Sequence, residues 1–82
     1  MDQDHDFPWA VDIPIPEAGL GPLLPVILDA AKSCAGGAMV TTRSEPKDAE
    51  VRKWFNRIAT RTPGDAQRMA QTFRSIGARR VR

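Results

Sequence analysis

Residues 7–16, FPWAVDIPIP, alternate between large apolar side chains and prolines or small residues. The odd positions carry Phe7, Trp9, Val11, Ile13 and Ile15. In an extended backbone these side chains share one face. Three prolines have the opposite parity, and the amides that they lack would all point toward one edge. We therefore expect an extended segment that pairs through its other edge only. It would lie either as an edge strand over this protein's own core or as an added strand on a partner's sheet.

This segment belongs to residues 1–21, which are acidic and rich in proline and which we expect to form an extended N-terminal arm. A chain of 82 residues has room for one domain, and a chain of that size hides only about 60% of the surface that its unfolded form exposes. We therefore expect one helical α+β domain over residues 22–82, with a thin core and a basic C-terminal half.

Residues 22–35, PLLPVILDAAKSCA, predict a helix. Its two prolines fall near the first turn, where a missing amide costs little, and Gly36 and Gly37 mark its end. Its side chains are apolar almost all round, so we expect it to be the central and most buried helix.

Residues 38–43, AMVTTR, favour β-structure and predict a short strand. After it, Ser44 is a candidate N-cap and Pro46 would lie in the first turn of a helix over residues 46–61. The apolar residues of that segment recur at spacings of three and four, as on one face of a helix: Val51, Trp54, Phe55, Ile58 and Ala59.

A third helix is expected from Thr62 to about Ile76, with Thr62 as its N-cap and Gly77 as its stop. Residues 78–82 could then pair with residues 38–43. The expected fold is a small three-helix α+β domain with a short two-stranded sheet and an extended proline-rich arm. Its order of elements resembles the layout of winged helix-turn-helix domains, which implies that the last helix enters the major groove of DNA.

Charge is divided sharply along the chain. Residues 1–42 carry six acids against one lysine, and residues 43–82 carry eleven Lys and Arg against four acids. Such polarity suggests a polyanionic partner for the basic half, or an acidic arm that folds over it.

Residues suited to catalysis are scarce, since the chain has one His, one Cys and no Tyr. His5 stands among three Asp residues near the N-terminus, where ligands rarely converge, and Cys34 reads as a small core residue. We therefore expect no enzyme activity, no cofactor and no metal. The start MDQDHDF resembles no secretory signal, and no run is long enough to span a membrane, so we expect a cytoplasmic protein with no membrane partner.

The expected third helix has a polar outer face of types that can read bases, because Gln can bond adenine and Arg can grip guanine. Gln67, Arg68, Gln71 and Arg74 lie on this face, and Arg79, Arg80 and Arg82 follow it for phosphate contacts. The leading hypothesis is a small non-catalytic regulatory protein that binds nucleic acid, with double-stranded DNA as the expected form.

The alternative hypothesis is an adaptor or inhibitor that docks on a larger protein through its N-terminal arm. Phe7 and Trp9 would be the anchors, because large aromatic side chains dominate the energetics of interfaces. A homodimer, formed through the edge at residues 78–82, is a further possibility.

Overall fold

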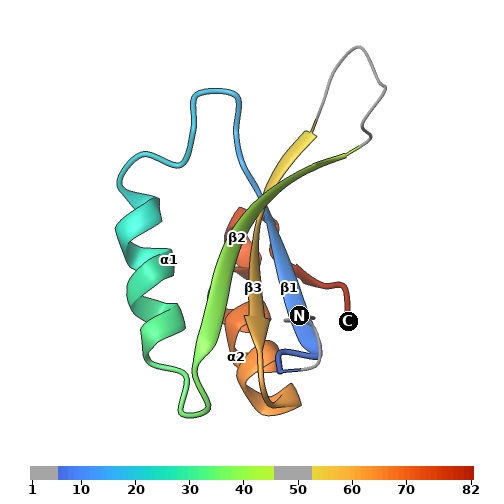
Figure 1. Ribbon diagram of the computed structural model, residues 1–82. Coiled ribbons are helices and arrows are strands. Elements are labelled where there is room, and N and C mark those ends of the chain that lie inside the picture. The colour runs from blue at the N-terminus through green and yellow to red at the C-terminus, as the bar shows by residue number, and fades with distance from the viewer. Residues whose placement is uncertain (1–5, 46–52) are drawn as a thin grey trace.

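The computed structural model describes residues 6–45 and 53–82 (Figure 1). Its two α-helices are α1 (Leu23–Lys32) and α2 (Pro63–Thr72), and a short 3-10 turn, η2 (Arg74–Ile76), follows α2. Its four strands are β1 (Trp9–Pro14), β2 (Ala38–Glu45), β3 (Lys53–Thr60) and β4 (Arg79–Arg80). The expectation of three helices and a two-stranded sheet is therefore wrong.

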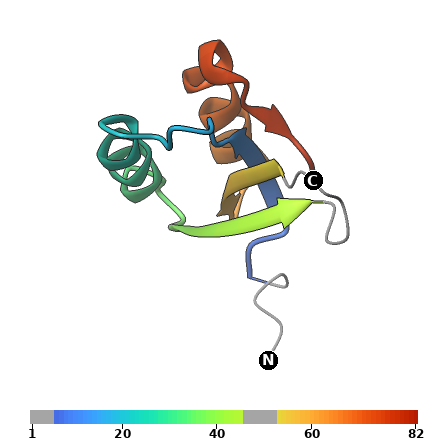
Figure 2. The same cartoon turned by 90° about the horizontal axis from the view of Figure 1, so that it is seen from above.

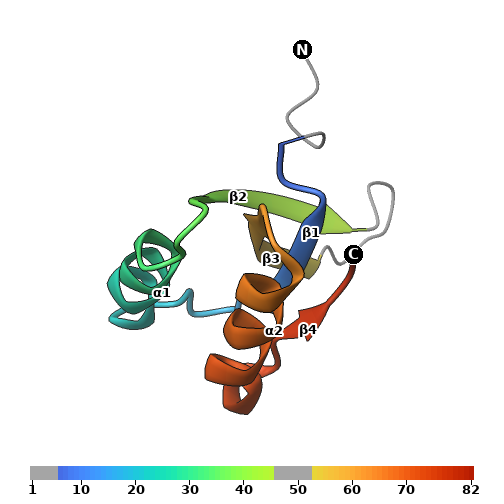
Figure 3. The ribbon, with the colours of Figure 1, turned by 90° about the horizontal axis from the view of Figure 1, so that it is seen from below.

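All four strands form one antiparallel sheet in the order β2-β3-β1-β4. The chain runs β1-α1-β2-β3-α2-β4, which is the split βαβ arrangement. Both helices lie on the same side of the sheet, as the views along its strands show (Figures 2 and 3). A β-hairpin separates the two helices in the chain, so the winged helix-turn-helix layout is also wrong.

The segment expected to be an arm contains β1, which lies between β3 and β4. β1 therefore pairs along both edges, not along one. The backbone N–H and C=O groups of its even residues point toward β4. Ala10 N donates to Arg82 O (3.3 Å) and Ala10 O accepts from Val81 N (2.9 Å). Pro14 is the next even residue after Asp12 and has no amide to donate, so it cannot extend the pairing toward Gly77.

The residues expected to form the second helix form β3 instead, as far as residues 53–60 are concerned; residues 46–52 lie outside the described part. The apolar residues of this segment divide between the two sides of the strand, with Trp54 and Ile58 on one side and Phe55 and Ala59 on the other. Strand pairing decides that this segment is a strand and not a helix, because β3 forms hydrogen bonds to β1 on one side and to β2 on the other. β-favouring residues such as Trp, Phe, Ile and Thr reinforce that outcome.

The core lies between the sheet and the helices. Val11, Ile13 and Ile58 contribute from the sheet, and Ile27 from α1 and Met69 from α2 are almost completely buried against them. The remaining buried members of the cluster are Ala31, Cys34, Ala66 and Phe73. α2 contacts β1, β3 and β4, whereas α1 contacts β2 at the edge of the sheet.

Local signals at the start of α2 and at the end of η2 are confirmed. Thr62 caps the helix, because its Oγ1 accepts a hydrogen bond from Asp65 N (3.2 Å). Gly77 follows η2 in the left-handed conformation, with φ of 94°. A Cβ at Gly77 would lie 2.9 Å from Pro14 Cγ, so both the conformation and the close approach require glycine.

Two further expectations fail at the edges of the fold. α1 is not the most buried helix, since Leu24, Val26 and Leu28 are exposed by 41%, 51% and 40%. Residues 78–82 do not pair with β2; β4 pairs with β1 at the opposite edge of the sheet. Within residues 6–45 and 53–82, neither helix has the length and apolar content needed to cross a membrane.

Candidate functional site

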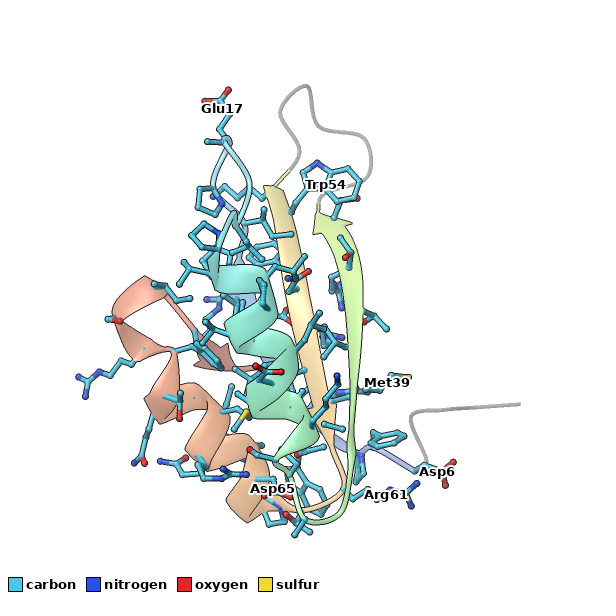
Figure 4. The ribbon with its side chains drawn as sticks, turned by 90° about the vertical axis from the view of Figure 1, so that its left-hand side faces the viewer. Asp6, Glu17, Met39, Trp54, Arg61 and Asp65 are labelled. Atoms are coloured by element: carbon cyan, nitrogen blue, oxygen red, sulfur yellow. The ribbon has the colours of Figure 1, made fainter. Side chains whose placement is uncertain are left out.

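The side of the sheet that faces away from the helices is here called the far face. Its side chains alternate with those of the core, and they are Ala10, Asp12, Pro14, Met39, Thr41, Arg43, Lys53, Phe55, Arg57, Ala59 and Arg79. Ala10 and Ala59 are buried yet do not belong to the core cluster between sheet and helices. Met39 points away from the helices in Figure 4, as this alternation requires.

A ladder of cationic and aromatic side chains runs along β3 on the far face. Lys53, Phe55, Arg57 and Ala59 follow one another at every second position. Alternate residues of a strand are separated by about 6.7 Å. Arg61 continues the ladder directly after β3, and it lies on the same side of the sheet (Figure 4). β3 therefore supplies two cations and an aromatic ring to a single surface, and the residue after it supplies a third cation.

A second row crosses the sheet through Arg57. In the strand register Thr41 lies opposite Arg57, Arg57 opposite Asp12, and Asp12 opposite Arg79. Residues in such cross-strand positions point to the same face. The four strands thus bring an arginine of β3 and an arginine of β4 to either side of one carboxylate.

That carboxylate is held in a two-pronged ion pair. Arg57 Nε donates to Asp12 Oδ1 (2.7 Å) and Arg57 Nη2 donates to Asp12 Oδ2 (3.0 Å). The side chains are 19% and 9% exposed, so both are largely removed from water. Among the far-face side chains that the structure describes, Asp12 is the only acid, and its charge is compensated by Arg57.

At one end of the far face, the Arg61 guanidinium lies over the ring of Phe7, 4.8 Å from its centroid. A cation over an aromatic face is attracted by the quadrupole of the ring. The contact leaves Phe7 half-buried and Arg61 exposed.

At the other end, β3 and the loop after β1 enclose an open groove of about 800 Å³. Its walls are mainly apolar, and polar groups come from Glu17, Thr42 and Lys53. Trp54 is 47% exposed and lies at the same end of the molecule as Glu17 (Figure 4). The other lining residues are Pro14, Ile15, Pro16, Gly19 and Phe55. Pro14, Lys53 and Phe55 belong to the far face, whereas Ile15, Thr42 and Trp54 alternate with far-face residues and belong to the helix side. The groove therefore lies at the end of the sheet, where the two sides meet.

The residues expected to read bases lie elsewhere. Gln67 and Gln71 are exposed on α2, and Arg74 is exposed on η2, on the helix side of the sheet. Arg79 lies on the far face, so the sheet separates it from α2. The two parts of the expected site therefore do not form one surface.

Arg68 is the remaining residue that we expected to contact bases, and its guanidinium forms hydrogen bonds within the protein. Its Nη1 donates to Ser33 Oγ (3.2 Å) and its Nη2 donates to Ser33 O (3.3 Å). Asp65 lies 3.4 Å from the same Nη2. Arg68 thus ties α2 to the C-terminal end of α1.

The other expected contact residues divide between the two sides of the sheet. Arg80 lies opposite Val11 and so shares the helix side, while the backbone of Arg82 pairs with Ala10. Phe7 is half-buried beside Arg61, and Trp9 is half-buried in β1, where it packs against the core. Neither aromatic residue projects from an arm.

Cys34 is buried where α1 and α2 meet, with its Sγ 3.8 Å from Arg68 Nη2. Burial raises the pKa of the Cys34 thiol and the Asp65 carboxylate adds to this, while Arg68 acts in the opposite direction. The thiol is therefore neutral near pH 7. In residues 6–45 and 53–82 no group of His, Cys, Asp and Glu could hold a metal ion. The cluster around His5 lies outside the described residues apart from Asp6.

Sequence reasoning missed Arg57, Lys53 and Phe55. A signal for them exists in residues 53–61, KWFNRIATR, where every second residue is basic or Phe until Ala59. Read with a period of two, this segment predicts a strand with one basic face.

Comparisons of this chain with protein-family models, with curated proteins and with solved structures found no match.

Proposed function

We propose that this protein is a non-catalytic nucleic-acid-binding protein that uses the far face of its sheet. The observation that carries the proposal is the clustering of cations from three strands on one surface, where the carboxylate of Asp12 is already paired with Arg57. Arg57 and Lys53 come from β3, Arg43 from β2 and Arg79 from β4. Phosphate groups are the ligands to which such a surface is best suited, and cation contacts to phosphate supply most non-specific affinity.

α2 supports this role less well than the sheet. Arg68 is committed to Ser33 and Asp65, so the outer side of α2 and η2 offers only Arg74 as an uncommitted described cation. In the helix-turn-helix mode of reading the major groove, a neighbouring helix also crosses the DNA backbone. In this fold the element before α2 is a strand.

Protein binding is a second candidate, favoured by the apolar side chains that α1 leaves exposed. Leu24, Val26 and Leu28 lie on α1, and with Trp54 they are the large hydrophobic side chains exposed in the described part of the chain. The anchors expected at Phe7 and Trp9 are half-buried, so α1 would replace the arm as the contact surface.

The proposal is tested by titrating a fluorescently labelled nucleic acid of mixed sequence with the protein at several salt concentrations. Lys53→Ala and Arg79→Ala each remove an exposed cation from the far face. Each variant is expected to weaken binding and to reduce the slope of log Kd against log salt by about 0.7 to 0.9 per lost contact. Arg57 is a poor probe, since its loss would leave Asp12 buried without its partner.

Arg74→Ala is the matched control, because it removes an exposed arginine on the helix side of the sheet. It is expected to leave the salt slope unchanged. A slope that falls for Arg74→Ala and not for the far-face variants would move the interface to α2 and η2. Absence of binding at low salt would reject a nucleic-acid partner.

A further inference from the structure

The width of the far face restricts the form of nucleic acid that it can read. Four strands at spacings of about 4.8 Å separate the outer backbones by about 14 Å before side chains are added. The major groove of DNA is about 12 Å wide and the minor groove about 6 Å, and the major groove admits a helix or a two-stranded ribbon. The far face is therefore too broad to enter either groove and to reach the edges of paired bases.

Bases that are not paired can instead be brought to the surface of the protein. The far face offers Phe55 between Lys53 and Arg57 on the same side of β3. Aromatic rings among cations are typical of surfaces that bind single strands, because bases stack on the rings while phosphates contact the cations.

The groove beside Phe55 adds a place for one base. Its volume of about 800 Å³ falls in the range of small-molecule sites. Trp54, which is 47% exposed, lines the groove, and so do Pro14 and Pro16, whose rings restrict the backbone there. Lys53 lies both in the groove and on the far face, so a strand held by its phosphates along β3 would pass the entrance.

We infer that the nucleic acid is single-stranded and that one of its unpaired bases enters this groove and stacks on Trp54. This inference rests on the proposed function, and it adds the form of the ligand and a specific contact. A single strand can contact the cations of the far face and the groove at once, because its phosphates are spaced along the cations while its bases are free to turn into the groove.

The test compares the affinity of a labelled single strand of about 12 nucleotides with that of the same strand in a duplex. Wild-type protein is expected to bind the single strand at least about 10-fold more tightly. Trp54→Leu is expected to weaken single-strand binding by about 5-fold to 150-fold, the range for loss of one stacked base. Trp54→Phe keeps an aromatic face and should retain most of the affinity.

Leu24→Ala is the matched control, because it shortens an exposed apolar side chain that does not line the groove. All three variants should keep the wild-type salt slope, since none changes a charge. Circular dichroism and thermal unfolding of each variant establish that the fold is retained.

The outcomes separate the inference from the proposed function. Duplex binding as tight as single-strand binding, or Trp54→Leu with wild-type affinity, would overturn the inference. If Lys53→Ala and Arg79→Ala still reduced the salt slope in that case, the proposed function would stand alone. No binding to either form would reject both.

Discussion

The two helices have the same length and lie on the same side of the sheet, yet their sequences and their burial do not correspond. α1 reads LLPVILDAAK and is largely apolar, while α2 reads PGDAQRMAQT and is largely polar. Each helix nevertheless buries two side chains, Ile27 and Ala31 in α1 and Ala66 and Met69 in α2. The apolar content of a segment therefore does not measure how much of it the fold covers.

Position in the sheet explains the difference. α2 lies over three strands, and its few apolar side chains all point toward them. α1 contacts the edge strand β2, so the fold can cover only one side of it. The apolar surplus of α1 remains exposed, which is the kind of surface that marks an interaction site.

Met69→Ala should have the largest effect on stability, because Met69 is 1% exposed in the centre of the α2 contact. Truncating a buried side chain of this size costs about 2–5 kcal/mol. Urea unfolding followed by circular dichroism measures the loss. Gln67→Ala, on the exposed side of α2, is the control. A loss below about 1 kcal/mol for Met69→Ala would mean that α2 is packed no better than α1.

Thr62→Ala removes the N-cap of α2 and should cost about 1 kcal/mol, because Asp65 N loses its acceptor. α1 has Pro22 at the corresponding position and no side-chain cap. Pro22→Ala should therefore cost less than Thr62→Ala in the same unfolding experiment. Equal losses of unfolding free energy for the two variants would show that the N-cap of α2 stabilises the protein no more than Pro22 does at the start of α1.

Arg68→Ala tests the tie between the helices and should have a smaller effect. Its guanidinium bonds to Ser33, but the side chain is 47% exposed, so solvent weakens the interaction. We expect a loss of about 0.5 kcal/mol. We also expect faster hydrogen exchange in the last turn of α1, measured by mass spectrometry. Exchange that accelerates equally in α2 would show that Arg68 does not act on α1 specifically.

Leu24→Ser combined with Leu28→Ser should change stability least, because the two residues are 41% and 40% exposed. The change in unfolding free energy is expected within about 0.5 kcal/mol for each site. If the variant instead unfolded at markedly lower urea concentration, α1 would be packed more tightly than its exposure indicates.

Several local features of the fold follow from the sequence alone. β2, the cap at Thr62 and the stop at Gly77 each depend on a few adjacent residues, and these predictions are confirmed. β3 was mispredicted because its apolar residues recur at the helical spacing of three and four, and the deciding partners lie about 45 positions earlier in β1. No window along the chain contains both strands.

The far face was missed for the same reason. Asp12, Arg57 and Arg79 are distant in the chain, and only the register of three strands brings them together. The charge division along the chain did indicate a cationic surface in the C-terminal half. It could not indicate that Arg68 of α2 and Arg79 of β4 would lie on opposite sides of a sheet.

The central place of β1 has a consequence for the rate of folding. Asp12 pairs with Arg57 and Arg79, so the strand made first finds its neighbours only in the last third of the chain. Such long-range closures slow folding relative to helical proteins of similar size. During synthesis an alternating apolar strand must wait for its neighbours, and that interval is when such a strand is most exposed to pairing with the wrong chain.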